Sequence, residues 1–274
     1  MQKQTIIFAL TLAVTLWTAT NLYAEDGRFG MTVSANYALG KYGGNTSTSI
    51  FYVPIIARYE TNVYSLKLTI PYVRLIGPGN VVSGINPIVL EKESDGSRRR
   101  GNGGFQNDNV GSSARDGLGD LVAAASYRLL DDQQYDLLAG ITGKIKIGTA
   151  DRRSGLGTGE NDYSIQLDLS KGINRFTAFG SAGYRFLGDP PGVNLSNGFF
   201  GTIGGSYRFT LETGGGLVFD FAKATSSSSS AVRELTAFIN FYVTPISKLQ
   251  VYVLRGFSNG GPDYGGGVSY SYSF

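Results

Sequence analysis

The charged side chains that could act on a solute alternate with apolar ones. Lys144 and Lys146 alternate with isoleucines, and Asp162 and Asp168 alternate with aromatic and aliphatic residues. Residues two positions apart lie on the same face of a β-strand. Fixed charges of both signs along one face of a sheet would attract and orient polar solutes, or would pair with one another.

The chain lacks the residues that several kinds of chemistry require. The chain has no histidine and no cysteine, so it has no His-based general base, no thiol nucleophile and no His or Cys metal ligand. A calcium site made by Asp151, Glu160 and Asp162 is a weaker interpretation than ordinary solvated loop charge. The sequence therefore predicts no enzyme, no metal site and no cofactor.

The elements that position the charges begin after an N-terminal targeting segment. Residues 1–24 contain Lys3, a short apolar stretch, and Leu22 and Ala24 at the minus-three and minus-one positions, which is the layout of a secretory signal peptide. The alternative is an anchoring helix, but the apolar stretch is short and Thr-rich for a membrane span. We predict cleavage after Ala24 and one domain over residues 25–274.

The composition of the remaining chain is unusual for a soluble domain. The sequence holds 39 Gly, 17 Tyr and 16 Phe, and its net charge of +3 gives no reason to expect a nucleic-acid partner. After the first 24 residues there is no apolar run long enough for a transmembrane helix. A closed β-barrel is the membrane architecture that fits this composition.

Alternation with period 2 predicts twelve strands. They lie near residues 29–40, 49–59, 63–73, 117–130, 135–149, 162–172, 175–187, 197–210, 214–224, 231–244, 248–258 and 264–274. Short and longer connections alternate between them, as in outer-membrane barrels. The predicted fold is all-β, a transmembrane antiparallel up-and-down β-barrel of about 12 strands. The alternative is a soluble two-sheet sandwich, which the small polar faces and the loop rhythm disfavour.

The cost of charge in hydrocarbon predicts which face lines the lumen. A Lys or Arg on the lipid face costs roughly 2–4 kcal/mol at the bilayer centre. The predicted pore-lining residues are Arg58, Lys67, Arg128, Lys144, Lys146, Asp162, Asp168, Arg185, Arg208, Asp220 and Glu234. For Arg58, Arg128 and Arg208, two interpretations stay open, a basic constriction or internal ion pairs, and the nearby acidic residues favour ion pairs.

Three charged residues share the apolar face instead. Lys223, Arg233 and Arg255 lie near strand ends that the topology places outside the cell. There their charged ends could reach anionic headgroups. We hypothesise that they contact the phosphates of lipopolysaccharide; the alternative is a solvated charged rim.

The connection 74–116 is too long for a plain connector. It contains Arg98, Arg99 and Arg100. These residues could bind surface polysaccharide or fold inward as a constriction, and a mobile external loop is the remaining interpretation.

The C-terminal segment has a distinct pattern. Tyr270, Tyr272 and Phe274 occupy alternate positions of the last strand, with serines between them. This pattern resembles the C-terminal insertion signal of outer-membrane proteins. The resemblance implies recognition by the barrel-assembly machinery.

Residues 116–187 resemble a family of bacterial outer-membrane proteins described as transporters or as proteins of the meta-pathway of phenol degradation. The residues that carry the resemblance are Gly117, Leu118, Gly119, Asp120, Leu121, Gly155, Gly157, Thr158, Gly159, Asp162 and Tyr163. The family often has a Lys-x-Pro-Thr-Gly stretch before the second motif, whereas this chain reads KIKIGTAD, without the proline. The resemblance implies a barrel linked to uptake of small, often aromatic, molecules, and it carries over no catalytic residues.

Together these observations predict a monomeric barrel in the outer membrane of a Gram-negative bacterium, acting as a porin-like channel. It would take up small solutes passively, aromatic or hydrophobic compounds among them. The partners predicted are outer-membrane lipid, lipopolysaccharide, the barrel-assembly machinery and a small-molecule permeant. The alternative is a non-conducting structural or surface-interaction barrel that acts through loop 74–116.

Overall fold

The structure is a computed structural model that describes residues 27–77, 81–82, 88–89, 113–226 and 229–274. The predicted signal peptide and the arginine cluster of the long connection lie outside the described residues. No helix in the described ranges is long and apolar enough to cross a membrane.

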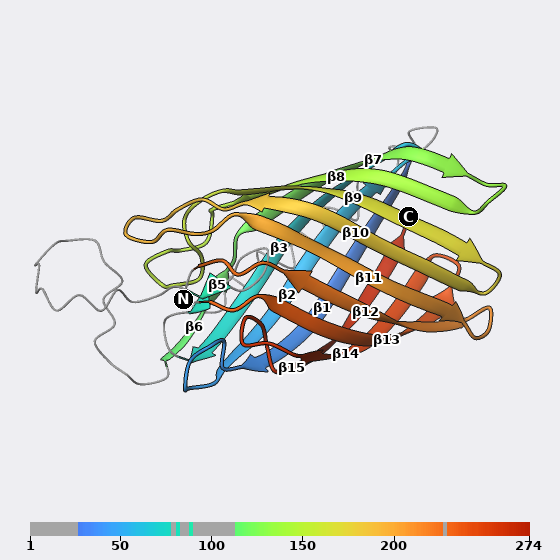
Figure 1. The fold of residues 1–274 in the computed structure, drawn as a ribbon. Helices are drawn as coiled ribbons and strands as arrows, with labels where there is room; N and C mark the ends of the chain where they lie inside the picture. Colours follow the sequence, from blue (N-terminus) through green and yellow to red (C-terminus); the bar gives the residue numbers. More distant parts are fainter. Residues whose placement is uncertain (1–26, 78–80, 83–87, 90–112, 227–228) are drawn as a thin grey trace, which may run out of the picture.

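Twelve antiparallel strands close into a barrel (Figure 1). They are β1 (Arg28–Gly40), β2 (Thr48–Glu60), β3 (Tyr64–Gly77), β7 (Leu121–Asp132), β8 (Leu137–Ile147), β9 (Asp162–Ile173), β10 (Phe176–Phe186), β11 (Gly198–Arg208), β12 (Thr213–Ala222), β13 (Val232–Thr244), β14 (Ser247–Gly256) and β15 (Tyr264–Ser273). Strand β1 pairs with both β2 and β15, so the sheet has no free edge at this point. The predicted fold class is confirmed, and each predicted strand bound lies within a few residues of the observed one.

Three shorter strands belong to the long connection. Strands β4 (Val81–Val82) and β5 (Ile88–Val89) pair only with each other. Strand β6 (Ser113–Leu118) pairs with the end of β3, and β7 pairs with its beginning. The prediction that 74–116 is all loop is therefore wrong at both ends, because 74–77 and 113–116 add rungs to the sheet. The pairing changes partner beside Pro71, whose carbonyl accepts a hydrogen bond from Gly119 N at 2.8 Å.

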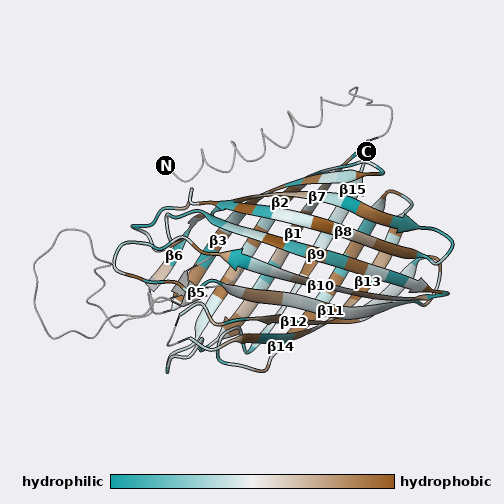
Figure 2. Ribbon diagram, turned by 45° about the horizontal axis from the view of Figure 1, so that its top comes forward, coloured by the Kyte–Doolittle hydropathy of each residue, from teal (hydrophilic) through white to brown (hydrophobic). Residues whose placement is uncertain are grey.

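The two faces of the barrel differ as the alternation predicts. Large apolar side chains such as Leu167, Ile203 and Phe199 are 58%, 63% and 70% exposed, and residues between them are more buried. Figure 2 shows hydrophobic and hydrophilic residues alternating along the strands. Apolar side chains exposed all round a closed sheet form the surface that hydrocarbon covers in a transmembrane barrel.

Short and long connections alternate around the barrel, as expected. Residues 61–63, 133–136, 174–175, 209–212 and 245–246 form the short turns at one end. At the other end, the longer connections include 41–47, 148–161, 187–197, 223–231 and 257–263. Asp136 and Asn174 have φ values of 49° and 58°, a left-handed conformation that short Asp and Asn side chains adopt more readily than most residues. The long-loop end corresponds to the extracellular side in outer-membrane barrels.

The facing predicts a large difference between two adjacent positions of β9. Leu167→Lys places a charge on the exposed apolar face and should lower the free energy of unfolding by about 2–4 kcal/mol in lipid vesicles. Gln166→Lys adds the same charge on the inner face and should change it by less than about 1 kcal/mol. Denaturant unfolding in vesicles measures both values, and equal losses would contradict the assigned facing.

Candidate functional site

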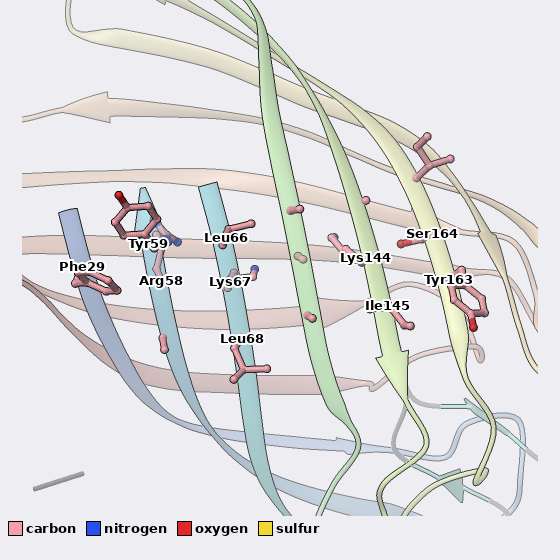
Figure 3. A pocket seen from close by; sticks show the side chains of 16 residues that line it. Phe29, Arg58, Tyr59, Leu66, Lys67, Leu68, Lys144, Ile145, Tyr163 and Ser164 are labelled. Carbon is pink, nitrogen blue, oxygen red and sulfur yellow. The ribbon is translucent and has the colours of Figure 1, made fainter. Parts of the chain in front are cut away.

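A row of cations crosses the inner face of neighbouring strands. Arg58 on β2 is directly opposite Lys67 on β3, and Ala124 on β7 lies between Lys67 and Lys144 of β8. Figure 3 shows Lys67 and Lys144 on the two sides of β7. Within the described part of the chain, no carboxylate lies within 4.0 Å of either lysine nitrogen. Neither lysine therefore forms a direct ion pair in this part of the chain, although the Asp168 carboxylate acts on Lys144 from a longer distance.

The arginines near the short turns differ in their partners. Arg128 Nη1 lies 2.7 Å from Asp131 Oδ2, which supports the ion-pair interpretation. Arg58 Nη1 lies 3.8 Å from Glu60 Oε2, and both side chains are about half exposed, so this pair is loose. Arg208 is exposed at the end of β11 and makes no ion pair within 4.0 Å in the described ranges. The three arginines do not form one network.

Carboxylates gather on the wall opposite the lysines. Strand β12 stands six places from β3 in either direction around the twelve-stranded barrel. Its Asp220 is directly opposite Glu234 of β13 and accepts a hydrogen bond from the Thr202 hydroxyl at 2.6 Å. Asp168 on β9 instead lies close to the basic side, where the Thr142 hydroxyl donates to it at 2.6 Å. Asp220 and Glu234 therefore lie across the barrel from Lys67, while Lys248 of β14, with the inward parity of Tyr252, adds a positive charge beside them.

Lys146 forms a buried ion cluster. Its Nζ lies 2.9 Å from Asp162 Oδ2 and 3.2 Å from Asp120 Oδ2, and it donates to Thr158 Oγ1 at 3.1 Å. Lys146 and Asp162 are 0% exposed. The expectation that they line an open pore needs correction, because residues 148–161 cover them.

Arg185 also differs from the prediction. Its side chain is buried, with the residue 2% exposed, and Nη2 donates to the carbonyl oxygen of Lys223 at 2.6 Å. Arg185 therefore holds the end of β10 against the segment that follows β12. It does not line the lumen.

The loop 148–161 folds into the mouth of the barrel. Its Leu156 belongs to a buried apolar cluster with Val73 and Leu75 of β3, both 0% exposed. Val73 and Leu75 share the inward parity of Lys67, so a loop that covers them must lie inside the barrel wall. Tyr42, from the connection 41–47, joins the same cluster, and burial with the nearby carboxylates of Glu234 and Asp263 raises its pKa. Two loops therefore occupy part of the extracellular mouth.

The residues behind the family resemblance meet at this loop. The Asp120 carboxylate accepts a hydrogen bond from Ala150 N at 2.9 Å. A Cβ on Gly157 would lie 2.9 Å from both oxygens of that carboxylate, and a Cβ on Gly117 would lie 2.8 Å from Leu156 Cδ1. Glycine is needed at both positions because the loop approaches the wall so closely. The sequence alone did not predict this packing, although the two Gly-rich motifs on either side of Lys146 were its signal.

The remaining carboxylates of the loop do not form a metal site. Asp151 accepts hydrogen bonds from Ser154 Oγ at 2.6 Å and Arg153 N at 2.9 Å, and these bonds lower its pKa. Asp162 is engaged by Lys146. In the residues that the structure describes, no group of three acidic side chains comes together.

Inward-facing aromatic rings cover the wall on the far side of β9. Each is directly paired with a glycine of the next strand: Phe179 with Gly204, Phe200 with Gly183, Phe238 with Gly216 and Tyr252 with Gly267. A Cβ on Gly183 would lie 2.6 Å from Phe200 Cζ, so the ring lies along the wall and not across the lumen. Lys144 Nζ lies 5.9 Å from the centre of the Phe200 ring, within cation–π range. The predicted site residues did not include these rings.

A separate hollow of about 770 Å³ lies against the wall around β7 (Figure 3). Ala123 and Ala125 form its small-residue floor, between Leu66 on one side and Ile145 and Tyr163 on the other. Leu66 and Tyr163 are 48% and 49% exposed, so the hollow opens on the apolar outer face. Arg58, Lys67, Ala124 and Lys144 also border it, so residues of both faces of the wall line this hollow.

A closed twelve-stranded barrel with an apolar exterior and a charged interior defines an outer-membrane type of β-barrel protein. The family described as "Putative MetA-pathway of phenol degradation" matches residues 43–274, and the chain belongs to this family. No curated protein matches the chain.

Solved structures of similar fold are distant in sequence. The chain resembles the KdgM porin with a TM-score of 0.53 and 10% identity, over 89% of this chain and 99% of that one. It resembles the KdgM porin in complex with disordered oligogalacturonate with a TM-score of 0.52 and 11% identity, over the same shares. At these identities the likeness shows the shared fold.

Removal of the buried lysine should loosen the loop. Lys146→Met leaves two buried carboxylates without their cation and should lower the free energy of unfolding by about 3–5 kcal/mol. Hydrogen–deuterium exchange of residues 148–161 should rise with it. Lys144→Met, on the same face but outside the cluster, is the matched control. Equal loosening in both variants would contradict the role assigned to Lys146.

Proposed function

We propose that this protein is an outer-membrane channel for passive uptake of small solutes. The observation that carries the proposal is the interior of the barrel, where Lys67 and Lys144 make no direct ion pair within the described residues and Lys67 lies on the wall opposite Asp220. Opposed fixed charges in a narrow lumen orient polar solutes as they pass. A twelve-stranded barrel is narrower than porins of 16–18 strands, so the permeants would be small.

The similar fold of KdgM supports this proposal. That protein is named a porin, and one of its structures holds oligogalacturonate. The family description of phenol degradation suggests aromatic permeants for this chain. Both support a transport role for this chain.

A non-conducting barrel acting through loop 74–116 is the competing function. A solid plug would use inward side chains to fill the bore and neutralise one another. The structure has small residues such as Ala124, Ser164 and Gly183 on the inner face between the cations and the rings. Ala124 leaves space between Lys67 and Lys144, and the ring over Gly183 lies along the wall, and both features favour a passage over a plug.

We also propose that Lys223, Arg233 and Arg255 bind lipopolysaccharide phosphates. All three are exposed at the long-loop ends of β12, β13 and β14. Two of them are already oriented: Lys223 Nζ donates to Asn197 O at 3.3 Å, and the Arg255 guanidinium lies 4.0 Å from the centre of the Tyr264 ring. A held cation loses less conformational entropy when it binds an anion.

The biogenesis of the barrel completes the proposal. A cleaved signal peptide over residues 1–24 would export the chain through the inner membrane. The barrel-assembly machinery would then recognise Tyr270, Tyr272 and Phe274, which are exposed on the outer face of β15. The protein would act as a monomer, because the barrel closes within one chain.

Channel activity is tested by planar-bilayer recording. Purified, heat-modifiable protein should give stepwise current openings in potassium chloride, because the charged lumen offers ions a polar path. The control is the same detergent without protein. A silent membrane with correctly folded protein would overturn the channel.

Lipid binding is tested by native mass spectrometry. Replacement of Lys223, Arg233 and Arg255 by alanine should reduce retained lipopolysaccharide several-fold, because three phosphate-binding cations are lost. Lys171→Ala removes an outward lysine at the short-turn end of β9 and serves as the control. Retention equal to the wild type in the triple variant would contradict the contact.

A further inference from the structure

We propose that the lumen contains a binding site for aromatic carboxylates, with the carboxylate held between Lys67 and Lys144 and the ring stacked on Phe200. The inference rests on the proposed channel function and names its class of permeant. The site is built from three strands, β3, β8 and β11, that the barrel brings to one stretch of its inner wall.

The anion half of the site follows from the placement of the two lysines. They flank Ala124, whose methyl group leaves the space between them open. Lys67 lies close enough to Lys144 and to Arg58 to be repelled by both. Asp168 is the acidic group that acts on Lys144, and its carboxylate already accepts a hydrogen bond from Thr142. Asp168 therefore offsets only part of the charge, and an anion between Lys67 and Lys144 would relieve the repulsion that Lys67 still feels.

The ring half of the site follows from Phe200. The ring rests over Gly183, and the Lys144 ammonium lies 5.9 Å from the ring centre, so a solute ring would stack on Phe200 beside this ammonium. Strand β9 lies between β8 and β10, and its Ser164 is directly opposite Lys144 and is also small. A solute lying along this wall therefore reaches the Lys144 ammonium and the Phe200 ring together, 5.9 Å apart. This separation suits a carboxylate attached directly to a flat ring.

The chemistry of the surrounding wall favours an aromatic ring over a sugar ring. Phe179, Phe200 and Phe238 present carbon faces, and the amide of Gln166 and the hydroxyl of Thr142 beside them already donate to Asp168. A sugar acid needs hydrogen-bond partners for each hydroxyl group that it desolvates, whereas a benzene ring gains from offset stacking. A cation of the same shape is excluded from this side, because the lysines repel it.

The test is a 19F NMR titration of 4-fluorobenzoate with folded protein in detergent micelles. Lys144→Gln should weaken binding about tenfold, because one of two charge-assisted contacts is lost. Phe200→Leu should weaken it roughly threefold to tenfold by removing the stacked ring. Lys171→Gln, with the same change of charge on the outer face, should bind like the wild type.

Competition experiments test the class of ligand. Benzoate should displace 4-fluorobenzoate better than cyclohexanecarboxylate or galacturonate, and Phe200→Leu should abolish this order. Benzylammonium should not compete. Displacement by galacturonate equal to that by benzoate, or binding unchanged in Lys144→Gln, would overturn the site.

Bilayer recording of the same samples separates this inference from the proposed function. Currents without Lys144-dependent binding of 4-fluorobenzoate leave a channel but remove the aromatic carboxylate site. Lys144-dependent binding without currents removes the channel and keeps the site. In the expected result, both are present, and benzoate interrupts the current less in Lys144→Gln than in Lys171→Gln.

Discussion

The pairing of β1 with β15 is the constraint on which the rest of the structure depends. In hydrocarbon every backbone N–H and C=O must find a partner within the protein, so a sheet that spans a membrane has to close. Ten consecutive residue pairs, from Gly30 with Ser273 to Leu39 with Tyr264, make this closure. Closure also fixes the facing of all twelve strands at once, because a shift of one residue would turn every side chain to the opposite face.

A second constraint follows from the inward facing of the polar residues, because charged side chains are costly to bury inside the barrel. Lys146, Asp120 and Asp162 have almost no exposure to water, and each would be costly alone. They are tolerable only as a set, with the loop 148–161 folded over them and Gly157 allowing the approach to Asp120. This mutual dependence gives a physical reason for motifs that lie far apart in sequence to occur together in one chain.

The strands could be predicted from the sequence, but the inward loop could not. Alternation reports which face a residue occupies, so β9 and β15 were placed within a residue or two. It does not report what covers that face. Lys144 and Lys146 have the same parity and stand two residues apart, yet one is partly exposed and the other is 0% exposed. Only the long-range packing of Leu156 against Val73 and Leu75 separates them.

The aromatic rings show how a narrow barrel can carry bulky side chains and keep its bore. A phenylalanine that stood perpendicular to the wall would block much of the lumen. Pairing Phe200 with Gly183 lets the ring lie flat against the neighbouring strand. Glycine weakens a strand by its backbone entropy, and the ring that covers it restores part of the lost packing. The abundance of glycine and the abundance of aromatic residues are therefore linked. Glycine gives the ring room to lie along the wall, and the ring restores part of the packing that glycine lacks.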